Sequence, residues 1–164
     1  MRVLGIDPGL RITGYGCLEG DGVRAAVVEA GVVRLMPKSG PTPSVEARLL
    51  ELDRDLAEMM ERLRPDLVAV EALFAHYDHP ATAVKMAHAR GVILLAARRA
   101  GVELAEITPA EVKRAVTGSG RAQKAQMQES VRALLGIREP LDPPDVADAL
   151  GIAMAAAARS TMPR

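Results

Sequence analysis

The order of apolar segments constrains the fold more than any other feature of this sequence. Three strand-like runs come first, at residues 2–7, 12–19 and 23–35. Short turns join them, and the Gly-Asp-Gly at 20–22 is typical of a β-hairpin. The sequence therefore predicts an antiparallel meander at the start of the chain.

Helices and strands alternate after the meander. Two further strands are predicted, at 67–71 and 102–107. Helix-like segments cover residues 45–64, 80–100, 109–117, 121–135 and 144–160. Because strands that alternate with helices usually run parallel, we expect an α/β fold with a mixed five-stranded sheet and helices on both faces.

Helix boundaries carry their own signals. Ser44 is a candidate N-cap for the first helix, which Pro65 should end. Thr108, Pro109 and Glu111 form the pattern of a capping box with proline at the first helical position. These signals fix where the helices start relative to the strands.

Composition places the chain among globular proteins. It has 164 residues, of which 49% are hydrophobic, enough for a sizeable core in one domain over residues 1–164. No apolar run is long enough to span a bilayer, and the first strand begins without a signal-peptide pattern. With one cysteine, Cys17, no internal disulfide can form. We expect a cytoplasmic protein.

The net charge is zero, but basic residues gather in one part of the chain. Residues 85–138 hold ten Lys and Arg against four Asp and Glu, an excess of six positive charges, whereas the remainder holds eleven against seventeen. A neutral protein can therefore present a basic face to a nucleic acid, although an ordinary solvated helix surface has the same composition. With three aromatic residues, the chain cannot build a stacking platform for single strands.

Two apolar strands each end in an acid. Asp7 closes the first strand before Pro8 and Gly9, and Glu71 closes the strand at 67–71. Asp7 alone can be explained as a turn residue. If the two strands are parallel neighbours, however, both carboxylates lie at the edge where open α/β sheets bind ligands.

The last helix begins with two more acids. Asp145 and Asp148 are three residues apart, so both project from one helix face. Asp142 can cap this helix with Pro143 at its first position, and the helix dipole then explains Asp145. The dipole does not explain Asp148, which has apolar neighbours in the sequence.

Four carboxylates in one crevice repel one another unless cations neutralise them. Ligands that are all oxygen favour Mg²⁺ or Mn²⁺ over Zn²⁺. Two such ions about 4 Å apart can activate a water and stabilise the leaving oxygen of a phosphodiester. The acids therefore predict a metal-dependent hydrolase of phosphodiesters.

Four segments, in this order, resemble the RuvC family of Holliday-junction resolvases: GIDPGLRITGYG, VEALF, VKRAVTGSGRAQK and DVADALGIA. The resemblance covers nearly the whole chain. It implies a ribonuclease-H-like fold and metal-dependent nicking of four-way DNA junctions during recombination and repair. Asp7, Glu71, Asp145 and Asp148 match the family's catalytic acids, and some members carry His where this chain has Asp145.

The resemblance also gives roles to basic residues. Lys113 and Lys124 match positions near the scissile phosphate, where a lysine can hold a phosphate oxygen or steady a developing charge. Arg114 and Arg121 are candidate clamps for the DNA backbone. A solvated surface role is the alternative for all four.

Two aromatic residues are further candidates for DNA contact. Phe74 follows Glu71 by three residues, in a segment that reads as a loop. Its ring can belong to the core, or it can wedge between bases at the junction centre, which is the role that the resemblance favours. Tyr77 is the second candidate.

A homodimer, implied by the resemblance, suits the chemistry because a junction needs two symmetric cuts and one crevice cuts one strand. The helix at 80–100 has more small and apolar residues than a core-facing stripe needs, so it is a candidate dimer surface as well as an ordinary sheet-covering helix. The residues considered for this surface are Ala81, Val84, Met86, Ala87 and Ala89. The resemblance further implies branch-migration partners of the RuvA and RuvB type.

Two other function classes fit parts of the pattern. The motif GIDPG also occurs in actin-like and sugar-kinase-like ATPases, but that fold needs two such domains and a second phosphate loop. A non-catalytic DNA-binding module leaves Glu71 and Asp148 unexplained, because acids near DNA weaken binding unless a metal neutralises them.

Overall fold

The computed structural model of the protein describes residues 1–20, 25–72 and 80–161. The elements, in chain order, are β1 (Arg2–Asp7), β2 (Ile12–Glu19), β3 (Ala26–Arg34), α1 (Val45–Leu63), β4 (Leu67–Glu71), α2 (Pro80–Arg99), β5 (Glu103–Ile107), α3 (Pro109–Thr117), α4 (Lys124–Leu134) and α5 (Asp145–Thr161). This order confirms the predicted succession of strands and helices. The helix predicted from residue 121 starts later, at Lys124.

The five strands form one mixed sheet in the order β3-β2-β1-β4-β5. β1, β2 and β3 pair antiparallel, as the meander predicted, and β1–β4 and β4–β5 pair parallel. Ile6 on β1 lies opposite Val70 on β4. The next residues, Asp7 and Glu71, therefore leave the two central strands at the same edge of the sheet.

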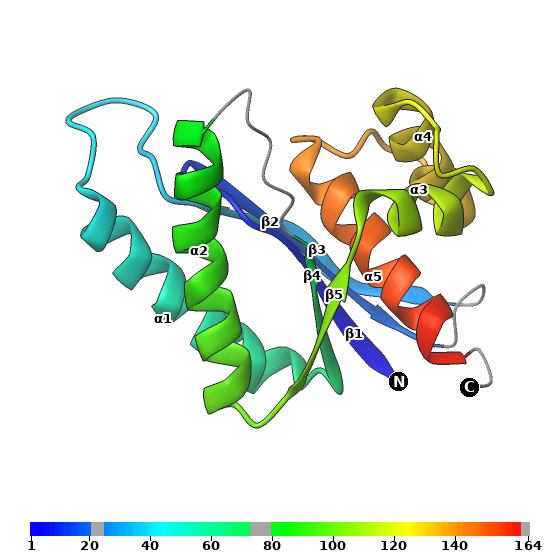
Figure 1. Ribbon diagram of the computed structural model, residues 1–164, viewed down its shortest axis with the longest axis horizontal. Helices are drawn as coiled ribbons and strands as arrows, with labels where there is room; N and C mark the ends of the chain where they lie inside the picture. The colour runs from blue at the N-terminus through cyan, green and yellow to red at the C-terminus, as the bar shows by residue number, and fades with distance from the viewer. Residues whose placement is uncertain (21–24, 73–79, 162–164) are drawn as a thin grey trace.

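Helices cover both faces of this sheet (Figure 1). α1 and α2 lie on one face and share a core with Leu4 and Ile6, whereas α3, α4 and α5 lie on the other and share a core with Val3. Successive residues of a strand point to opposite faces. Asp7 therefore points to the same face as Val3, toward α5.

The caps predicted from the sequence are formed. The Ala47 N–H donates to the Ser44 hydroxyl at the start of α1, at 3.4 Å. At the start of α3, the Glu111 N–H donates to the Thr108 hydroxyl at 3.2 Å, and the Thr108 N–H donates to the Glu111 carboxylate at 2.7 Å. This reciprocal capping box fixes the direction in which α3 leaves β5.

Helix α5 lies directly on β1 and β2, and glycines make this approach possible. A Cβ on Gly5 would overlap the carbonyl oxygen of Ala149, and one on Gly16 would lie 2.6 Å from the Leu150 Cδ2. The helix contributes mainly alanines to this contact, so backbone packs close to backbone. As a result, the first turn of α5 lies beside the end of β1.

No helix within the described residues is long and apolar enough to cross a membrane.

Candidate active site

Asp7 and Glu71 reach the site because each is the last residue of a central strand. Both point to the sheet face that α5 covers, because Leu67 and Ala69, at even spacing before Glu71, belong to the core on that face. The strand interior before each acid is buried, whereas the acids themselves are half-buried. The carboxylates are therefore held by rigid strands and still open to the pocket.

The first turn of α5 supplies the other two acids. The helix begins at Asp145, so Asp142 does not cap it in the way the sequence suggested. Because the start lies later than predicted, Asp148 also belongs to the first turn, where the positive end of the helix dipole favours an acid. The helix dipole therefore helps to stabilise the charged forms of both Asp145 and Asp148.

A pocket of about 330 Å³ lies between these acids and the helices α3 and α4. It contains three of the four predicted acids and both predicted lysines. The lining residues are Asp7, Glu71, Met86, Pro109, Val112, Lys113, Lys124, Met127, Asp148 and Ile152. Asp145, the first residue of α5, is not in this lining.

The electrostatics of the pocket are dominated by crowded negative charge. Burial, and then the neighbouring carboxylates of Asp148, Glu71 and Asp145, raise the pKa of Asp7 from 3.8 to about 7. Lys124 lowers this pKa in part. The like charges are therefore close enough to interact strongly, and the site needs positive charge beyond one lysine.

Two residues of α4 hold Asp148. The Lys124 Nζ lies 2.6 Å from one carboxylate oxygen, and the Gln128 side-chain amide donates to the other at 3.1 Å. Burial lowers the pKa of Lys124, but its attraction to Asp148, Asp7 and Asp145 outweighs this effect and the net pKa is raised. Lys124 thus stays charged in the pocket.

Gln128 was missed by the sequence reasoning. It follows Lys124 by four residues on α4, so it lies on the same helix face and reaches the same partner. That spacing is a signal that could have identified it. Together the two side chains satisfy both oxygens of a carboxylate that is 15% exposed.

The donor set fits Mg²⁺ or Mn²⁺, because every candidate ligand is a carboxylate. The raised pKa of Asp7 also indicates that the site suits a metal, because a bound cation would offset the repulsion between the neighbouring carboxylates. In the described part of the chain, however, no three Asp, Glu, His or Cys side chains converge closely enough to hold an ion as they stand. To hold an ion together, these carboxylates would have to turn toward one another, and Asp148 would have to leave its contact with Lys124.

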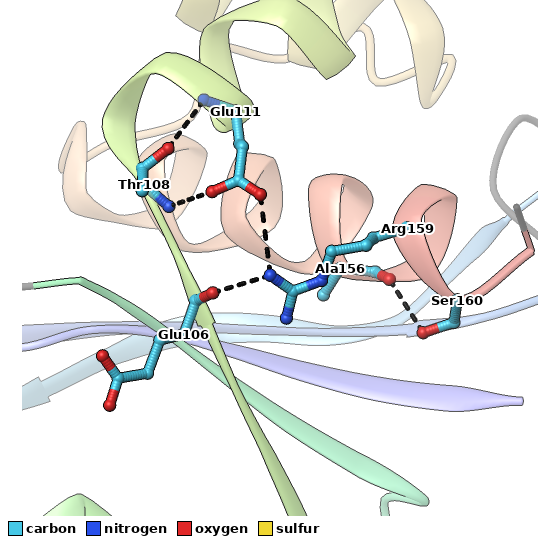
Figure 2. A network of polar contacts seen from close by, with 6 residues as sticks. All are labelled: Glu106, Thr108, Glu111, Ala156, Arg159 and Ser160. Carbon is cyan, nitrogen blue, oxygen red and sulfur yellow. Dashed lines mark hydrogen bonds and ion pairs between the residues drawn. The ribbon is translucent and has the colours of Figure 1, made fainter. Parts of the chain in front are cut away.

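A second polar network, shown in Figure 2, anchors α3. This helix also carries Lys113, which lines the pocket. Arg159, near the end of α5, donates to the backbone oxygen of Glu106 at 2.8 Å and pairs with Glu111 at 3.6 Å. Glu111 also caps α3 together with Thr108. The network therefore joins α5, β5 and α3 on the side of α3 next to the sheet.

The other predicted DNA contacts that the structure describes fall outside the pocket. Arg114 on α3 and Arg121 before α4 are exposed and do not line it. Phe74 and Tyr77 lie outside the described residues.

Comparison with known proteins provides independent evidence. The family model described as "Crossover junction endodeoxyribonuclease RuvC" matches residues 3–156. A crossover junction endodeoxyribonuclease RuvC from Rhodopirellula baltica is 45% identical over 152 residues, covering 93% of this chain and 83% of the relative. The one from Pelotomaculum thermopropionicum is 43% identical over 164 residues, covering 100% and 97%.

A solved structure, T. thermophilus RuvC in complex with a Holliday junction substrate, has a similar fold. It gives a TM-score of 0.84 at 32% identity and covers 98% of this chain and 95% of that chain. The ribonuclease-H-like fold predicted from the sequence is thereby confirmed.

Proposed function

Because the chain belongs to the RuvC family of crossover junction endodeoxyribonucleases, we propose that the pocket between β1, β4, α3, α4 and α5 is its catalytic site. The protein is a nuclease that resolves four-way DNA junctions. The observation that carries the site assignment is that Asp7, Glu71 and Asp148, from three separate elements, line the same pocket. Strand ends and a helix start hold them there, so the arrangement is a property of the fold.

Enzymes of this family are metal-dependent nucleases, and we propose that Asp7, Glu71, Asp145 and Asp148 hold two Mg²⁺ or Mn²⁺ ions. Such ions supply a water nucleophile at neutral pH and stabilise the leaving oxygen of the cleaved phosphodiester. Burial and the carboxylates of Asp148, Glu71 and Asp145 all raise the pKa of Asp7, which supports a place for it at the centre of the set.

The lysines have separate roles in this proposal. Lys124 neutralises Asp148 in the free protein, and its ammonium can hold a phosphate oxygen once that carboxylate turns to a metal. Lys113 lines the pocket from α3, a helix fixed at both its cap and its contact with Arg159. A charge on a fixed helix is suited to stabilise the transition state.

The function is tested by cleavage of a synthetic four-way junction with and without Mg²⁺ or Mn²⁺. We expect paired nicks, symmetric about the branch point, that require the metal and are absent on linear duplex. ATP turnover without nicking would instead indicate the ATPase class, and binding without nicking would indicate a DNA-binding module.

We predict that Lys113→Ala lowers the cleavage rate about a hundredfold and the junction affinity only slightly, because a positioned charge acts mainly on the transition state. The rate is measured in single turnover and the affinity by titration without metal. Arg114→Ala is the comparison, since this neighbour on α3 is exposed outside the pocket and should lose affinity more than rate. Proportional losses of rate and affinity for Lys113→Ala would make it a phosphate anchor only.

We further propose a two-fold homodimer, with α2 in its interface. Val84 is 55% exposed and Leu95 47% exposed on one face of α2, with His88 between them. Ala89, also considered for this surface, is fully buried against the sheet, so its inclusion was wrong, and the side chain of Ala81 lies outside the described residues. Val84 and Leu95 are eleven residues apart, about three helical turns, so both lie on the same face of α2, which a partner helix could cover.

Sedimentation should give about twice 17.4 kDa at micromolar concentration. Leu95→Glu should shift the protein toward the monomer and reduce paired cutting. Leu50→Glu, at a leucine of α1 that is 51% exposed, is the control and should leave association unchanged. A dimer that tolerates Leu95→Glu would exclude this face of α2.

The remaining assignments follow from the same function. We propose that residues 1–164 act as a single nuclease domain, that Arg114, Arg121, Phe74 and Tyr77 contact junction DNA, and that branch-migration proteins of the RuvA and RuvB type deliver the junction. A cytoplasmic location is proposed because the enzyme must reach chromosomal DNA.

A further inference from the structure

Arg90 is a charged residue in the core. It lies in the middle of α2, and 6% of its surface is exposed. Taking a guanidinium out of water costs several kcal/mol unless it is paired and hydrogen-bonded. The contacts of this side chain therefore indicate why a charged residue is kept in the core.

The guanidinium spans the ends of two strands. Its Nη1 donates to the backbone oxygen of Glu71 at 2.7 Å, and its Nη2 lies 2.7 Å from the Glu106 carboxylate on β5. Val70 and Glu106 are register partners in the parallel pair β4–β5. Arg90 thus binds at the edge of the sheet where the candidate active site lies.

Arg90 contacts the backbone of Glu71, not its side chain. With a second hydrogen bond, this contact holds both polar groups of the peptide that joins Glu71 to Ala72. The carbonyl of Glu71 is held by Arg90, and the N–H of the same peptide, from Ala72, donates to the Ile107 oxygen at 2.8 Å. A peptide bond is planar, so fixing both groups fixes its plane. The plane in turn limits the direction in which the Glu71 side chain leaves the end of β4.

We propose that Arg90 is a positioning residue that orients Glu71 toward the metal-binding pocket through this peptide. The inference rests on the proposed role of Glu71 as a metal ligand. Arg90 itself is not a ligand, since its two contacts within the described residues are a backbone oxygen and a carboxylate that is 55% exposed on β5. Its effect should therefore be seen in metal affinity and not in DNA affinity.

The test measures Mn²⁺ binding to the full chain without DNA, by the loss of the free Mn²⁺ signal in electron paramagnetic resonance. Arg90→Met keeps the length of the side chain but removes both contacts, and we expect Mn²⁺ affinity to fall about tenfold, as for other residues that orient metal ligands. Arg90→Lys keeps the charge and can restore one contact, so its loss should be intermediate.

The matched control is Arg99→Met on the same helix. Arg99 pairs with Asp53 at 3.1 Å and lies away from the pocket, so Mn²⁺ affinity should not change. Glu106→Gln removes the charge partner but leaves the Arg90 contact with Glu71, and it should lower the melting temperature while keeping Mn²⁺ affinity within about twofold. If Glu106→Gln weakens Mn²⁺ binding as much as Arg90→Met does, the effect is not transmitted through the peptide and the proposal fails.

Two further outcomes separate this inference from the proposed function. Glu71→Gln should weaken Mn²⁺ binding strongly, and adding Arg90→Met to it should weaken binding no further, because the positioned group is already lost. Normal Mn²⁺ binding by Glu71→Gln would refute the role of Glu71. Weak binding by Glu71→Gln together with normal binding by a folded Arg90→Met would refute only the role of Arg90.

Discussion

Replacing Asp7 by Asn should lower junction nicking about a thousandfold or more and leave junction binding equal or tighter. The substitution keeps the shape of the side chain but removes a charged metal ligand at the centre of the pocket. Metal ions contribute several kcal/mol to phosphodiester cleavage, and each 1.36 kcal/mol is tenfold in rate. Binding is spared because the loss of a negative charge can only reduce repulsion of DNA phosphates.

Glu71→Gln and Asp148→Asn should behave in the same way. Asp145→Asn should be severe but less complete, because Asp145 does not line the pocket and some members of the family have His at this position. The rate is measured in single turnover with excess enzyme, and the affinity without metal. Asp53→Asn, an acid of α1 that pairs with Arg99 on the other face of the sheet, is the control and should cut normally. Near-normal nicking by any of the three pocket variants removes that residue from the site.

Asp7→Asn should also stabilise the metal-free protein above neutral pH. Folding raises the pKa of Asp7 from 3.8 to about 7, so the folded state binds this proton more tightly than the unfolded state. The wild-type protein therefore loses stability as the pH rises from about 4 through 7, and Asn removes that loss. Melting temperatures at pH 4 and pH 8 check this, since the gain in stability should be large at pH 8 and small at pH 4.

The sequence predicted the arrangement of the acids because strand ends follow simple rules. Parallel pairing of the first and fourth strands brings Asp7 and Glu71 to the same edge, and the observed register bears this out. The three-residue spacing of Asp145 and Asp148 likewise placed both on one helix. These inferences needed only the order of strands and helices and the regular repeat of side-chain directions within each of them.

What the sequence could not predict depends on distances between elements. Lys124 was interpreted as a phosphate ligand or a surface residue, yet it pairs with Asp148, because the packing of α4 on α5 decides its nearest anion. The sequence around Gln128 and Arg90 did not predict their roles, because the role of a polar helix residue depends on which distant side chain or backbone group it contacts in the fold. The last helix, predicted at 144–160, is observed at Asp145–Thr161, but Asp142 lies too far before its start to be the N-cap.

Gly14 connects this packing to the site. It lies opposite Asp7 in the pairing of β1 with β2. A Cβ added to Gly14 would overlap the carbonyl oxygen of Asp145 and lie 2.7 Å from its carbonyl carbon. Both atoms belong to the backbone of the first turn of α5, so the turn can make room only by moving away from the sheet. The absence of a side chain at Gly14 is therefore what lets the two acids of α5 approach Asp7.

We predict that Gly14→Ala lowers the cleavage rate about a hundredfold, because a shift of about 1 Å in a catalytic group has an effect of this size. Gly16→Ala is the matched control. It adds the same atom two residues along the same strand, against the same helix, but its closest contact is the Leu150 side chain at 2.6 Å. Leu150 is fully buried and its backbone nitrogen would lie 3.2 Å from the added atom, so Gly16→Ala should cost stability, on the order of 1–3 kcal/mol. This overlap lies beyond the first turn of α5, so the acids at its start should move less than in Gly14→Ala.

The two variants are compared by cleavage rate per folded molecule, after the folded fraction of each is measured by denaturant unfolding. Gly14→Ala should be slow even when it is fully folded, and it should need a higher metal concentration for half-maximal cutting. Gly16→Ala should cut at close to the wild-type rate once the folded fraction is taken into account. If the two variants lose rate equally at equal folded fraction, the position of the first turn of α5 is not what limits cleavage, and the two acids of α5 tolerate more movement than their closeness to Asp7 implies.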